Sequence, residues 1–88
     1  MPPHINSVTP NSGDPGDRFN LIILGDVFSR VTACDFGTGV EVVSYNIIND
    51  GTIAAKVDIS KNANPGLRDV VLTDPSGSGT LSIGFEVK

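Results

Sequence analysis

The segment TLSIGFEVK, residues 80–88, alternates between apolar residues and polar or small ones. Successive side chains of a β-strand point to opposite faces, so this period of two predicts a strand with one face on a core and the other toward solvent. The side chains expected to point inward are Leu81, Ile83, Phe85 and Val87.

Six further runs carry the same signal. Strands are predicted over residues 5–8, 19–24, 31–36, 40–48, 52–59 and 67–73. The run 19–24 is apolar on both faces, because Ile22 and Leu24 alternate with the inward-facing set, and this predicts a central or covered position in a sheet. In the run 40–48 the alternation changes phase between Val42 and Tyr45, which predicts a β-bulge there.

Turn signals separate these runs, and no stretch sustains a helical period. Asn49-Asp50-Gly51 is typical of a hairpin turn, because Asp-Gly tolerates the left-handed backbone that such turns require. About seven short strands, with turns every ~8–12 residues, predict an all-β sandwich of antiparallel strands. A chain of 88 residues has room for one core, so residues 1–88 are interpreted as a single domain, excised from a larger multidomain protein.

The composition excludes several classes of function. One histidine, one cysteine and no tryptophan cannot supply a His/Cys metal cluster or a disulfide scaffold. Neither Ser76 nor Ser78 lies in a Gly-x-Ser-x-Gly motif, so no catalytic, cofactor-binding or metal site is predicted. The net charge is −4 and the six basic residues lie singly along the chain, which argues against nucleic-acid binding. No apolar run approaches the ~20 residues that span a bilayer, and the opening MPPH lacks the pattern of a signal peptide.

The reactive residues have simpler interpretations. His4 is expected in a frayed N-terminus, and Cys34 alternates with Phe36 as a small core residue. A weak Ca²⁺ site remains an open alternative, because extracellular modules can bind Ca²⁺ through loop carboxylates. The carboxylates in question are Asp14, Asp17, Asp26, Asp35, Asp50 and Asp74, and the competing interpretation is that they bond the backbone of their own turns.

Four pieces of the sequence carry a family resemblance through their order and spacing. They are IxSVxPxxGxxG (residues 5–16), LxIxGxxF (21–28), Phe36-Gly37 and AxPGxxDVxLT (63–73), followed by a closing FxV (85–87). Together they resemble the IPT/TIG domain family, immunoglobulin-like domains found in plexins, Rel-type transcription factors and many bacterial surface and carbohydrate-active proteins. The chain lacks the cysteine pairs of the receptors and the basic loop of the transcription factors, which favours the bacterial or archaeal multidomain type.

The resemblance implies a seven-stranded immunoglobulin-like sandwich of the E-set type that is not an enzyme and needs no cofactor. Its expected role is that of a spacer and a protein–protein or domain–domain interaction unit in a secreted or cell-surface protein, monomeric when isolated. The alternative is an accessory carbohydrate-binding or packing domain of a carbohydrate-active enzyme, which the scarcity of aromatic residues disfavours. The candidate interaction surface consists of outward-facing apolar residues: Ile22, Leu24, Val43, Tyr45 and Val71.

Overall fold

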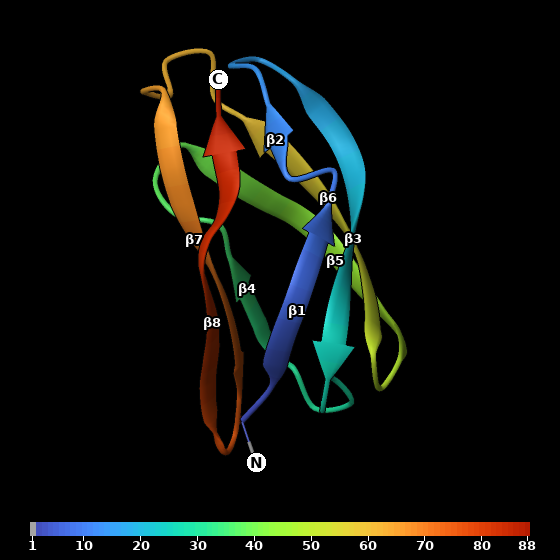
Figure 1. Ribbon diagram of the computed structural model, residues 1–88. Helices are drawn as coiled ribbons and strands as arrows, with labels where there is room; N and C mark the ends of the chain where they lie inside the picture. Colours follow the sequence, from blue (N-terminus) through green and yellow to red (C-terminus); the bar gives the residue numbers. More distant parts are fainter. Residues whose placement is uncertain (1) are drawn as a thin grey trace.

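A computed structural model describes residues 2–88 and shows two packed four-stranded sheets (Figure 1). The first sheet has the order β1 (His4–Thr9), β3 (Arg18–Asp26), β6 (Thr52–Ile59) and β5 (Val40–Asn49). The second has the order β2 (Ser12–Gly13), β8 (Gly77–Val87), β7 (Gly66–Asp74) and β4 (Ala33–Asp35). The described chain contains no helix, so the prediction of an all-β sandwich is confirmed.

The first segment of the chain is divided between the two sheets. β1 pairs with β3 in antiparallel fashion, and the chain then crosses over so that β2 pairs with β8 in parallel. Sequence periodicity predicted about seven antiparallel strands, whereas the described chain forms eight and one pair is parallel. A two-residue strand such as β2 is too short to show a period of two, which explains why it was not predicted.

The core lies between the sheets and is built by the predicted alternation. β6 places all of its expected residues, Ile53, Ala55, Val57 and Ile59, in the interior. Phe28, Phe36 and Phe85 are fully buried, while Phe19 is only partly buried at the margin. The predicted central strand is confirmed, since β3 lies between β1 and β6, but its outer face is open to solvent.

Two β-bulges change which side chains point toward the core. The predicted phase change in β5 is confirmed as a register shift between Val42 and Ser44. In β8, residues 82–84 face the single residue Asp69 of β7, and this larger bulge turns Ile83 outward with 59% of its surface exposed. The inward assignment of Ile83 was therefore wrong, whereas Phe85 and Val87 are buried as predicted.

One end of the sandwich is closed by a corner of β3 against the β5–β6 hairpin. The amide of Gly25 donates to the carbonyl of Gly51 at 3.0 Å, and the amide of Phe28 donates to the carbonyl of Asp50 at 2.9 Å. A Cβ on Gly25 would collide with the His4 carbonyl and lie 2.6 Å from the Phe28 ring. Glycine is required here because the β1 backbone at His4 and the Phe28 ring both pack directly against it.

Candidate functional site

A row of exposed charged side chains crosses three strands of the first sheet. Arg18 on β3, Asp58 on β6 and Glu41 on β5 lie opposite one another in register. Arg18 donates to an oxygen of Asp58 at 2.9 Å, and this bond, with the charge of Asp58, raises the pKa of Arg18. Asp58 therefore faces a cation on one side and a second carboxylate on the other.

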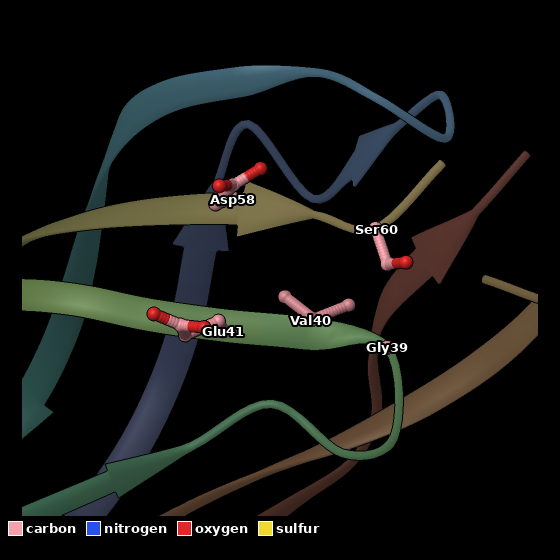
Figure 2. Close-up of a pocket in the computed structure, with 5 residues that line it drawn as sticks. All are labelled: Gly39, Val40, Glu41, Asp58 and Ser60. Atoms are coloured by element: carbon pink, nitrogen blue, oxygen red, sulfur yellow. The ribbon is translucent and has the colours of Figure 1, made fainter. Parts of the chain in front are cut away.

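A depression of about 420 Å³ opens beside this row, where β5 begins and β6 ends (Figure 2). Glu41 and Asp58 project toward the same side of the sheet, and Gly39, Val40 and Ser60 complete the lining. A second depression, of about 580 Å³, shares Gly39 and Ser60 with the first and reaches Arg68. Both openings are shallow and polar, and they lie at one end of the sandwich.

Arg68 acts as a tie between loops at this end. Its guanidinium donates to the carbonyl oxygens of Thr38 at 2.8 Å and Asn64 at 2.6 Å. Two connections far apart in the sequence are thereby held against β7. Because these bonds use several of the guanidinium N–H donors, we interpret Arg68 as a structural residue that holds the loops together.

The predicted interaction residues do not form one surface. Ile22 and Leu24 lie on the outer face of the first sheet with 37% and 42% of their surface exposed. Val43 is the extra residue of the β5 bulge and is also exposed. Val71 is half-buried on β7, in the other sheet.

Tyr45 lies opposite Ala55, in the row that faces the core, at the free edge of β5. Its hydroxyl donates to the carbonyl of Val31 at 3.4 Å, across the gap between the two sheets. Burial raises the pKa of this phenol, and the neighbouring Cys34 raises it further. Tyr45 therefore lies at an edge of the sandwich, where 36% of its surface is exposed, while Ile22 and Leu24 form the apolar part of the open outer face.

The titratable candidates are mostly engaged in structure. His4 begins β1 and pairs in register with Asp26, so the expectation of a frayed terminus at this residue was wrong. Cys34 is partly buried against the core, and burial raises the pKa of its thiol to about 11. A thiol that holds its proton this tightly is a poor nucleophile at neutral pH.

Four of the six candidate carboxylates, those of Asp17, Asp35, Asp50 and Asp74, bond the backbone of their turns or of a neighbouring corner. Asp17 accepts from the amide of Asp14, Asp35 from that of Gly37, and Asp50 from that of Ser29. The buried Asp74 accepts from the amides of Ser76 and Gly77. Over residues 2–88, no three His, Cys, Asp or Glu side chains come together as a metal site.

Sequence reasoning missed the charged row and the exposed Ile83. The row joins residues up to 40 positions apart and depends on strand register. An isolated glycine inside a strand pattern is a known sign of a bulge, so Gly84 was the available signal for Ile83.

Two sheets over one core, with the first segment shared between them, define an immunoglobulin-like β-sandwich. The chain belongs to the IPT/TIG domain family, whose family model matches residues 3–87. A comparison with curated proteins finds no match. Domains of this family are general immunoglobulin-like interaction modules and are typically non-catalytic. Among residues 2–88 there is no helix long and apolar enough to cross a membrane.

Proposed function

We propose that this domain is a spacer and a protein–protein or domain–domain contact unit within a larger bacterial or archaeal protein that is secreted or displayed at the cell surface. The observation that carries the proposal is the placement of the chain ends. The N-terminus and the C-terminus lie at opposite ends of a body measuring 35 × 20 × 18 Å (Figure 1). Neighbouring domains joined at these ends would be held apart along the long axis.

The open face of the first sheet supports the contact role. Ile22 and Leu24 are exposed there, and a shallow depression of about 400 Å³ lies between Ile22, Ala54 and Lys56. An apolar centre with polar neighbours is the usual composition of a small interface. Sugar binding has less support, because Tyr45, the aromatic residue that a stacking platform would need, uses its hydroxyl to close the sheet edge.

The spacer role is tested by attaching a folded reporter domain to each end and measuring the inter-reporter distance by small-angle scattering. We expect the reporters to lie on opposite sides of the module, separated by at least its 35 Å length. Reporters folded back side by side would contradict the spacer role. The control is the same reporter fusion carrying the Ile22→Ser and Leu24→Ser changes. The distance between its reporters should be unchanged, because these residues lie on the outer face of the first sheet and not at its ends.

The location is tested separately. An antibody raised against the domain should detect its parent protein in the secreted or surface fraction of the source cells. Detection only in the cytoplasm would contradict the exported location and would leave the spacer result unaffected.

A further inference from the structure

β1 and β8 lie next to each other although they belong to different sheets, and we call the line of contact between them the seam. The two strands are in close contact at both ends of the seam and leave an opening in the middle. The two strands run in the same direction side by side (Figure 1). At one end Gly79 packs so tightly on the Pro3 carbonyl that a Cβ there would collide with it. At the other end the amide of Glu86 donates to the carbonyl of Asn11 at 2.9 Å.

Both strands are irregular at the opening between these closures. β1 shifts register between Ile5 and Ser7, and β8 carries the bulge of residues 82–84. The resulting slot has a volume of about 230 Å³. This is below the ~300–1,000 Å³ of ordinary small-molecule pockets. Because both ends are closed, no extended strand can pass along the seam, and only a single side chain or a molecule of similar size fits.

The lining of the slot is free of charged side chains. Asn6 and Asn11 contribute carboxamides, Ser7 and Ser82 contribute hydroxyl groups, and Leu81 contributes an apolar wall. The charged groups of the first sheet are absent from it, although every other depression described above has at least one charged residue in its lining. An uncharged occupant with an apolar body and a hydrogen-bonding tip matches this chemistry.

Ile83 at the rim adds a second, independent observation. Its backbone has φ +57°, a left-handed conformation that is a genuine outlier for a β-branched residue. The Asp69 carboxylate accepts the Ile83 amide at 2.9 Å and helps to hold this conformation. The side chain is mostly exposed, so its burial does not compensate for the strain. An apolar contact with a partner would explain both the strain and the exposure.

We propose that the β1–β8 slot receives one tyrosine side chain from a loop of a partner protein, with Ile83 packing on the partner surface beside it. Tyrosine combines a rigid apolar ring with a polar tip and is enriched at interfaces. The ring would lie on Leu81 and Ile83, and the hydroxyl would reach the carboxamides and serine hydroxyls. This inference rests on the proposed role as a contact unit and adds the chemistry of the partner.

The probe for this proposal is p-cresol, the tyrosine side chain as a free molecule, titrated into the ¹⁵N-labelled domain. We expect saturable shifts at the amides of Asn6, Ser7, Ser82 and Ile83, with those of Val43 and Ile48 on β5, at the far edge of the first sheet, unmoved. The Ile83→Asn variant should bind about tenfold more weakly. Asparagine tolerates the left-handed backbone, so this variant stays folded while losing the apolar rim. The matched control is Ile48→Asn, an exposed isoleucine in the other sheet, which should bind p-cresol like the parent.

Three results would overturn the proposal. They are the absence of saturable shifts, equal weakening by the two isoleucine variants, and shifts at the slot with methyl glucoside but not with p-cresol. None of them would alter the distance between terminal reporters, so failure of the slot is distinguishable from failure of the spacer role.

Discussion

The ring of Phe36 meets the ring of Phe85 edge-on, with centroids 5.5 Å apart and planes at 85°. Phe19 stacks on Phe85 with centroids 6.3 Å apart and planes at 25°. Both sheets contribute to this aromatic cluster, since Phe19 belongs to β3 and Phe85 to β8. Edge-to-face contacts of this kind stabilise a core beyond the area that they bury.

The Phe85→Ala change should therefore lower the free energy of unfolding by about 3–5 kcal/mol. The measurement is urea unfolding followed by circular dichroism. Phe19→Ala is the control and should cost less, because Phe19 is only partly buried. A loss below about 1 kcal/mol for Phe85→Ala would contradict its central position.

Gly25→Ala should lower the free energy of unfolding by about 1–3 kcal/mol, because the new methyl group would collide with the His4 carbonyl and the Phe28 ring. It should also speed hydrogen exchange at the Phe28 amide, whose bond to Asp50 depends on this corner. Gly16→Ala strains a backbone at φ +90° but makes only an ordinary contact with the Lys61 side chain, at 3.5 Å, so it should leave Phe28 exchange unchanged. Equal exchange in both variants would refute the packing explanation.

Ile83→Gly should raise the free energy of unfolding by about 1 kcal/mol, because glycine adopts the left-handed conformation without steric cost. Thermal unfolding provides the measurement. The control Ile48→Gly should lower stability instead, since this exposed strand residue lies outside the positive-φ set. Destabilisation by Ile83→Gly would show that its side chain contributes to the folded state.

Cys34 should react slowly with iodoacetamide at pH 8 in the folded protein and faster in urea. Burial raises its pKa to about 11 from the ordinary value of 9.0. The folded state therefore holds the thiol proton more tightly than the unfolded state, so this group lowers stability as the pH rises from 9 toward 11. The Cys34→Ala variant should lose less stability between pH 9 and pH 11 than the parent protein. Identical dependence of the free energy of unfolding on pH in the two proteins would contradict the raised pKa of Cys34.

Glu41→Lys should raise the free energy of unfolding by about 0.2–1 kcal/mol, because it replaces a like-charge neighbour of Asp58 with an opposite charge. High salt should reduce the gain, since exposed charges are screened. Glu86→Lys makes the same change of net charge on β8 and is the matched control. An equal gain from both changes would point to net charge rather than to the Asp58 contact.

Sequence periodicity predicted the parts of the fold that follow from local alternation. The pairing of β6 with β3 contains no bulge, so the alternation along β6 is unbroken. The four residues of β6 that were predicted to point inward are all buried. Ile83 was misassigned because the bulge that turns it outward is held by Asp69, 14 residues away. Tyr45 keeps 36% of its surface exposed, as predicted, but the bulge places it at the sheet edge in the row that faces the core rather than on the outer face. The Arg18–Asp58 pair spans 40 positions and requires a register that single-strand patterns do not contain.

The parallel pairing of β2 with β8 has a mechanical consequence. The amide of Glu86 bonds Asn11 and that of Lys88 bonds Gly13, both across the same short pair of strands. Tension between the chain ends would draw the first segment and β8 in opposite directions along their length, because the termini lie at opposite ends of the body. These bonds then carry the load in shear and must break together. β2 could slide along β8 only after both bonds had broken.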